Sequence, residues 1–317
     1  MSNLYLSCCC DGLLRQRFSL SGLMIASVLL TCSSLALAAG PNNEARKHLE
    51  RMSVALQELS YQGVFVYRRD EDLAAMRVIH LAHKEGEREL LLTLTGEARE
   101  TVRDSRRFGL MGQQVAARLA GVESYYRLAP VSRDRVAGRD ARLIAVAPRD
   151  QFRYGYRLWL DAKTGLLLKS DLLSEQGRIL EQVMFTSIEL LSEKEKQRLL
   201  AEVDAQLVTP EERNATPVER SEWLVATVPV GFQLITTRTT TPQGGVAHMI
   251  YSDGLASVSV FIEAEQRSSE KPFIGVSSMG AVNAYGNMVE RHQVTVVGEV
   301  PEITVRTIGQ SIRYQGQ

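Results

Sequence analysis

Apolar and polar residues alternate with a period of two through much of this 317-residue chain, and most regularly between residues 154 and 190. Three such runs predict strands, at 156–160, 166–172 and 179–190. Short turns separate them, and each turn ends on a glycine, Gly165 or Gly177, which tolerates positive φ. Long strands joined by tight turns form an antiparallel meander. The fold class is therefore expected to be α+β, with mainly antiparallel β-structure.

The segment before this meander predicts one helix and further strands. Residues 42–60 repeat apolar side chains at steps of three or four, which is typical of an amphipathic helix lying on a sheet. Residues 61–67 and 76–81 alternate as strands and predict a hairpin. More strands are expected at 89–95, 106–112, 123–128 and 142–147.

A domain boundary is expected after the meander. Ser192 and Glu195 form a capping box that predicts a short helix through residue 203. Two prolines in the polar run 209–217 then indicate a linker, which we place at 206–219. The sequence thus predicts a larger domain over 39–205 and a smaller one over 220–317.

Strand patterns also dominate the smaller domain. They lie at 223–228, 232–237, 246–251, 255–263, 275–285 and 293–297, with a turn at 252–254. Pro301 is expected to begin a final helix that buries Ile303 and Ile308.

The N-terminus has the pattern of a secretory signal peptide. Arg15 and Arg17 precede the apolar run 18–30, and the small residues 36–38 offer an A-x-A cleavage site ending at Ala38. We therefore expect residues 1–38 to be removed and the mature protein to act outside the cytoplasm. An uncleaved anchor is the alternative, and Thr31 disfavours lipid attachment at Cys32. All four cysteines precede the cut (Cys8, Cys9, Cys10 and Cys32), so the mature chain can form no disulfide or thiolate metal site.

Sequence motifs give no support for catalysis. The chain has no P-loop, G-x-G-x-x-G, G-x-S-x-G or H-E-x-x-H motif, so we expect neither an enzyme, a metal site nor a cofactor. A hydrolase using carboxylates is an alternative without a supporting motif. Basic and acidic residues balance at 37 each, which gives no electrostatic reason to expect nucleic acid as a partner.

Two sets of residues are candidates for binding. Apolar side chains on the strands of the larger domain either fill its core or line a lipid cavity: Phe65, Tyr67, Met76, Val78, Leu90, Leu92, Leu158, Leu160, Met184 and Phe185. Arginines form either a solvated strand face with a long polar loop or an anion- or partner-binding rim: Arg99, Arg103, Arg106, Arg107, Arg133, Arg135, Arg139 and Arg142.

The chain resembles the MucB/RseB family. The resemblance rests on the order and spacing of Tyr61-Gln-Gly-Val-Phe-Val-Tyr67, Tyr156-Arg-Leu-Trp-Leu-Asp-Ala-Lys-Thr-Gly165, residues 169–173, residues 180–185 and the tail 297–309. It implies that the larger domain is an open half-barrel like that of the lipoprotein carriers LolA and LolB, wrapping a helix, beside a smaller β-rich domain. It identifies no catalytic residue.

The resemblance also implies a function. Family members are periplasmic proteins that bind the periplasmic segment of a transmembrane anti-sigma factor (MucA- or RseA-like) and shield it from site-one proteolysis. They thereby restrain the envelope-stress sigma factor, with outputs such as alginate synthesis, until lipid or lipopolysaccharide releases the block. A lipid or lipoprotein carrier is the alternative, and a homo-oligomer is left open. We expect aspartate at Phe65 or Met184 to abolish the response to lipid.

Overall fold

The computed structural model describes residues 41–83, 86–96, 100–104, 121–206, 216–217, 222–240, 246–264 and 271–315. The expected signal peptide, all four cysteines, the strand expected at 106–112, and Arg99, Arg106 and Arg107 lie outside these residues. No helix in the described ranges is long and apolar enough to cross a lipid bilayer.

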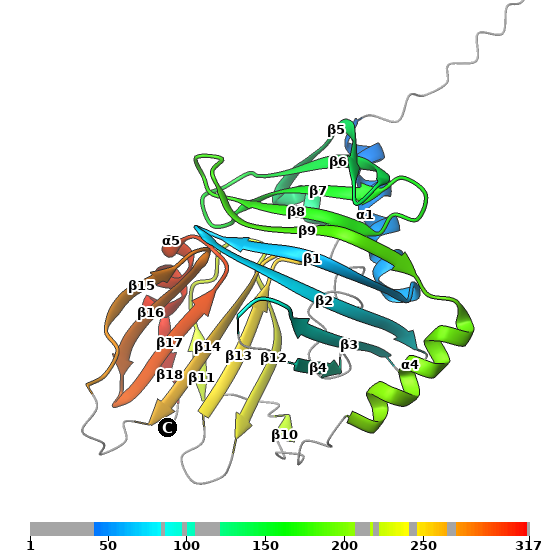
Figure 1. Ribbon diagram of the computed structural model, residues 1–317. Coiled ribbons are helices and arrows are strands. Elements are labelled where there is room, and N and C mark those ends of the chain that lie inside the picture. Colours follow the sequence, from blue (N-terminus) through cyan, green and yellow to red (C-terminus); the bar gives the residue numbers. More distant parts are fainter. Residues whose placement is uncertain are drawn as a thin grey trace, which may run out of the picture. The chain divides into compact units, whose positions relative to one another are not determined.

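Nine strands form the sheet of the larger half, and every neighbouring pair is antiparallel (Figure 1). They are β1 (Tyr61–Arg69), β2 (Asp72–His83), β3 (Gly86–Thr93), β4 (Glu100–Asp104), β5 (Tyr126–Val136), β6 (Arg139–Pro148), β7 (Gly155–Asp161), β8 (Leu167–Leu173) and β9 (Ile179–Leu190). The order β4-β3-β2-β1-β9-β8-β7-β6-β5 leaves β4 and β5 at the two edges, so the sheet is open. The predicted meander is confirmed as β7, β8 and β9.

Helix α1 (Pro41–Glu58) covers one face of this sheet. Its apolar stripe, including Leu49 and Leu56, packs with strand residues such as Tyr61, Ile144 and Phe185 in the main core. The His80 imidazole reaches the Leu56 carbonyl at 3.0 Å, which ties the end of the helix to β2. The expected helix over 42–60 is therefore confirmed with slightly shifted ends.

Helix α4 (Glu193–Gln206) packs on the opposite face, because Leu199 and Val203 form a small core with Leu81 and Leu90. The predicted capping box opens this helix. The Glu195 carboxylate accepts a hydrogen bond from the Ser192 backbone N–H at 3.0 Å. The sheet is thus covered in part on both faces.

A second sheet lies in the C-terminal part, with the order β10-β12-β13-β14-β17-β16-β15. Its strands are β10 (Thr216–Pro217), β12 (Gln233–Thr240), β13 (Val246–Ser252), β14 (Ser257–Ala264), β15 (Gly275–Met279), β16 (Val282–Val289) and β17 (His292–Gly298). A small sheet pairs β11 (Trp223–Val225) with β18 (Ile312–Tyr314). Helix α5 (Glu302–Gln310) buries Val305 and Ile308 in the core of this part.

Two predictions for the larger half were wrong at turns. The arginine-rich stretch around 133–142 is no long polar loop: it belongs to the β5–β6 hairpin, whose strand pairing continues to Val136 and Arg139. Ala137 and Gly138 make the tight turn with positive φ angles of 48° and 73°, and alanine gives no turn signal. The strand expected at 123–128 likewise begins as a short 3-10 helix, η1 (Val122–Ser124), before β5.

Two predictions for the smaller half also need correction. Residues 275–285 form two strands rather than one, because the chain turns between Met279 and Val282. Ile303 is 38% exposed, whereas Val305 and Ile308 are fully buried. Steps of three from Ile308 reach Val305, so Ile303 lies on the solvent side of α5.

Candidate functional site

The ten apolar candidates divide between the two faces of the nine-stranded sheet. Strand pairing places Phe65 opposite both Met76 and Phe185, so these three share one face. Tyr67, Val78, Leu158 and Leu160 lie on the same face, the one covered by α1.

Leu90, Leu92 and Met184 lie on the opposite face. Met184 immediately precedes Phe185 and packs with Trp159 and Leu168 in a separate small core. Leu90 contributes to the core under α4. The structure therefore brings together seven of the ten candidates and separates the other three from them.

Burial distinguishes core residues from surface within the set. Val78, Leu158, Leu160 and Phe185 are buried, whereas Phe65, Tyr67 and Met76 are only half-buried. The Phe65 ring packs edge-on to Phe185 at 5.7 Å. Phe65 and Met76, opposite one another on β1 and β2, are thus apolar positions of this face that keep some exposed surface.

Tyr67 marks where this face becomes polar. Burial, together with the charge and hydrogen bond of the Glu181 carboxylate, raises the pKa of Tyr67 to about 12. Its hydroxyl therefore stays protonated at neutral pH and donates to Glu181.

Two small pockets lie among the described residues. One of about 160 Å³ lies between α1 and the β5–β6 hairpin, and one of about 190 Å³ is lined by residues of β1, β2 and β9 such as Gln62, Arg77 and Ser187. Pockets for drug-sized ligands usually measure about 300–1,000 Å³. None of the ten apolar candidates lines either of these two pockets.

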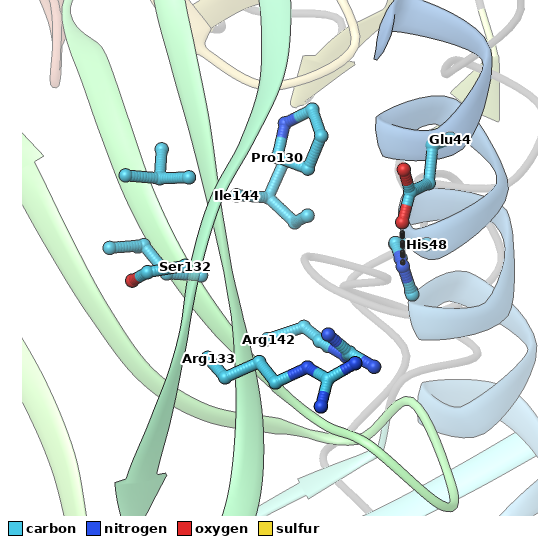
Figure 2. Close-up of a pocket in the computed structure, with 9 residues that line it drawn as sticks. Glu44, His48, Pro130, Ser132, Arg133, Arg142 and Ile144 are labelled. Carbon is cyan, nitrogen blue, oxygen red and sulfur yellow. Dashed lines mark ion pairs between the residues drawn. The ribbon is translucent and has the colours of Figure 1, made fainter.

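The arginine candidates separate according to their partners. Arg139 pairs with the buried Asp161 carboxylate, and Arg135 donates to the Gly138 carbonyl at 3.0 Å. Arg133 and Arg142 both line the 160 Å³ pocket, opposite Glu44 and His48 of α1 (Figure 2). Of Arg103, on β4, only the backbone is described.

Asp161 is held by several donors at the β7–β8 turn. It accepts backbone hydrogen bonds from Lys163 at 2.9 Å and Thr164 at 2.7 Å. Burial acts to raise its pKa, but hydrogen bonds from Arg139 and Thr164 outweigh burial and lower the pKa below its ordinary value. Arg139 therefore stabilises a turn, which sets it apart from Arg133 and Arg142.

Sequence reasoning missed a buried charged cluster around Arg153, in the loop between β6 and β7. This fully buried side chain donates to the carboxylate of Asp253 at 2.7 Å and to the Val230 carbonyl at 2.6 Å. It also donates to Asp150 at 2.9 Å. Asp253 belongs to the β13–β14 turn, so the cluster links the nine-stranded sheet to the C-terminal part.

Aromatic rings complete the surroundings of Arg153. Its guanidinium lies 5.0 Å from the ring centre of Tyr125, 5.5 Å from Tyr126 and 5.1 Å from Phe232. The Tyr126 hydroxyl donates to Asp253 at 2.9 Å. Residues distant in sequence meet here, and the turn predicted at 252–254 gave no sign that Asp253 would contact them.

Two further contacts join the same parts of the chain. The Asn283 amide donates to the Tyr154 hydroxyl at 3.0 Å, and the Thr304 hydroxyl donates to the Phe152 carbonyl at 2.7 Å. The loop 149–154 is therefore a polar joint between the large sheet and the C-terminal part.

The described residues define a class of protein: a two-part, β-rich chain with half-buried apolar side chains on one sheet face and a basic pocket beside α1. His, Cys, Asp and Glu residues in the described ranges form no group able to hold a metal ion. A half-buried apolar sheet face is a common feature of proteins that bind other molecules.

Comparison with known proteins gives the family. The model of the MucB/RseB N-terminal domain matches residues 44–203, and that of the MucB/RseB C-terminal domain matches residues 217–313. The chain belongs to the MucB/RseB family.

Individual relatives align with most of this chain. The sigma factor AlgU regulatory protein MucB of Pseudomonas aeruginosa is 36% identical over 312 residues, covering 90% of this chain and 96% of that protein. The sigma-E factor regulatory protein RseB of Haemophilus influenzae is 27% identical and covers 91% and 96%. A crystal structure of MucB in complex with MucA(peri) is 34% identical, with a TM-score of 0.65, and covers 86% of this chain and all of that one.

Proposed function

We propose that this protein is a periplasmic regulator that binds the periplasmic segment of a MucA- or RseA-like anti-sigma factor. Bound in this way, the segment is shielded from site-one proteolysis, and the envelope-stress sigma factor stays restrained. The observation that carries the proposal is the 34% identity to MucB, which has been solved in complex with MucA(peri), over 86% of this chain. The same relationship supports a periplasmic location after cleavage near Ala38 and a role in binding rather than catalysis.

Binding must offset the conformational entropy that the anti-sigma segment loses when it becomes ordered. Ordering an extended segment costs about 1–2 kcal/mol per residue in backbone entropy. The site must therefore supply apolar contacts and paired polar groups.

Release by lipid follows from differential affinity. A buried acyl chain gains about 0.8 kcal/mol per methylene, so ten methylenes contribute roughly 8 kcal/mol before ordering costs. Shifting a two-state equilibrium from 1:99 to 99:1 requires about 5.5 kcal/mol. A single chain is therefore sufficient if the partner-bound shape cannot hold it. Phe65, Tyr67 and Met76 are the residues that we assign to this site.

A protection assay tests the function. The purified anti-sigma segment is incubated with the site-one protease, alone or with an equimolar amount of this protein. We expect this protein to slow cleavage at least tenfold, and lipopolysaccharide to restore the rate. Unchanged cleavage at saturating protein would refute the regulatory function and leave the carrier alternative, which capture of many lipoproteins from envelope extracts would support.

A further inference from the structure

Two like charges face each other across the β5–β6 hairpin. Arg133 and Arg142 are directly opposite residues of the two strands. Like charges in this position destabilise a strand pair. Neighbouring arginines avoid the problem, because Arg139 pairs with Asp161 and Arg135 caps the turn.

Among the described residues, neither Arg133 nor Arg142 has such a partner. In the parts of the chain that the structure describes, no carboxylate forms an ion pair with either guanidinium. Both side chains line the same pocket and extend toward α1 (Figure 2). Glu44 lines the same pocket but pairs with His48, so the repulsion between the two arginines is relieved by no direct ion pair among the described residues, and an anion held between them would relieve it.

The opposite wall of the pocket adds little positive charge. His48 faces the arginines from α1, and its pKa is lowered by burial and then by the charges of Arg51 and Arg142, which outweigh the opposing effect of Glu44. The imidazole is therefore neutral at neutral pH and can accept or donate one hydrogen bond. Glu44 lies beside it at 3.8 Å. Two guanidinium groups and one carboxylate leave the pocket with an excess of positive charge, which favours an anion.

We propose that Arg133 and Arg142 bind a phosphate monoester in the pocket between α1 and the β5–β6 hairpin. A phosphate monoester has three terminal oxygens and can accept hydrogen bonds from both guanidinium groups at once, whereas a carboxylate offers only two oxygens. The volume of about 160 Å³ is sufficient for a phosphate group. The assignment of this pocket to the head group of a releasing lipid rests on the proposed function. Its assignment to free phosphate does not.

Calorimetric titration of the secreted protein with inorganic phosphate at pH 7.5 tests the site itself. We expect saturable binding, and at least a tenfold weaker affinity in the double variant Arg133→Gln, Arg142→Gln. The matched control Arg127→Gln, Arg178→Gln removes the same charge from two exposed positions and should change the affinity less than twofold. Equal binding by both double variants, or none by the parent protein, would overturn the proposal.

Vesicle flotation separates the two sources of phosphate. Phosphatidylcholine vesicles carry either phosphatidic acid, which ends in a monoester, or phosphatidylglycerol, a diester. Preference for phosphatidic acid that is lost in the Arg133, Arg142 double variant identifies a lipid head group. Phosphate binding without that preference identifies free phosphate, and both results support the site.

Folding and partner binding are measured on the same variants. Because the substitutions remove a repulsive pair, the double variant should unfold at the same temperature as the parent protein or higher at low salt. If the parent protein does not bind phosphate and the double variant no longer binds the anti-sigma segment, the two arginines contact the protein partner. That result would overturn the proposal. Failure of the parent protein to bind the segment would refute the proposed function and leave the phosphate titration unaffected.

Discussion

Replacing Arg153 with alanine should destabilise the protein more than most single substitutions. Its side chain and that of Asp253 are both fully buried and lie 2.7 Å apart. Removing the guanidinium leaves the Asp253 carboxylate buried with only Tyr126 and backbone N–H groups as donors. Breaking a buried pair in this way costs about 3–5 kcal/mol. That is a large share of the roughly 5–15 kcal/mol of a typical domain.

Equilibrium unfolding in urea measures this cost. Trp159 lies in the large sheet and Trp223 in the C-terminal part, so tryptophan fluorescence reports on both. Arg178→Ala, at an exposed turn position, is the matched control and should stay within about 0.5 kcal/mol of the parent protein.

A double-mutant cycle isolates the ion pair. Arg153→Met combined with Asp253→Asn should destabilise less than the sum of the two single changes, because neither partner is then left as an unpaired buried charge. A loss below about 1 kcal/mol for Arg153→Ala, or strict additivity in the cycle, would refute the reasoning that the pair joins the two parts of the chain.

Three other predictions test separate features. Phe65→Asp should abolish displacement of the anti-sigma segment by lipid, whereas Met184→Asp, on the opposite face, should leave it intact; equal effects in a fluorescence-anisotropy displacement assay would contradict the face assignment. Gly231→Ala should lower the free energy of unfolding by about 1–3 kcal/mol, because the new Cβ would lie 2.7 Å from the ring of Tyr125. Gly121→Ala has a similar positive φ but open space around the new Cβ, and it should lower the free energy of unfolding by about 1 kcal/mol. Thermal unfolding compares the two variants. The pKa of Asp161 is lower in the folded protein than in the unfolded chain, so the ionised carboxylate stabilises the fold fully above the unfolded pKa of about 4, and this contribution is lost as the pH falls below that value. The unfolding free energy of Asp161→Asn should therefore fall less steeply in acid than that of the parent protein. Equal slopes for the two proteins would contradict this.

Local patterns were sufficient to predict much of the architecture. The period-two runs of β7, β8 and β9, the stripe of α1 and the Ser192–Glu195 capping box are all encoded by neighbouring residues, and the structure confirms them. The β5–β6 hairpin was missed because its turn contains Ala137, which seldom adopts positive φ. Gly280 was placed inside a predicted strand, because a single glycine in an alternating pattern does not show whether its φ is positive.

The candidate site was less predictable because it depends on register and on distant partners. A list of apolar strand residues does not show which face each takes, so Met184 and Phe185 were grouped although they point in opposite directions. The cluster of Arg153 joins residues about 100 positions apart, and single-residue patterns carry no information on such pairs. The opposition of Arg133 and Arg142 likewise became visible only with the strand pairing.

Size-exclusion chromatography of the secreted protein with the periplasmic segment of the anti-sigma factor, with and without lipopolysaccharide, tests the central claim most directly. The account predicts co-elution of the two proteins, and separation when the lipid is added. Separate elution without lipid, or a ternary complex that persists with it, would contradict the claim that this protein holds either the segment or the lipid.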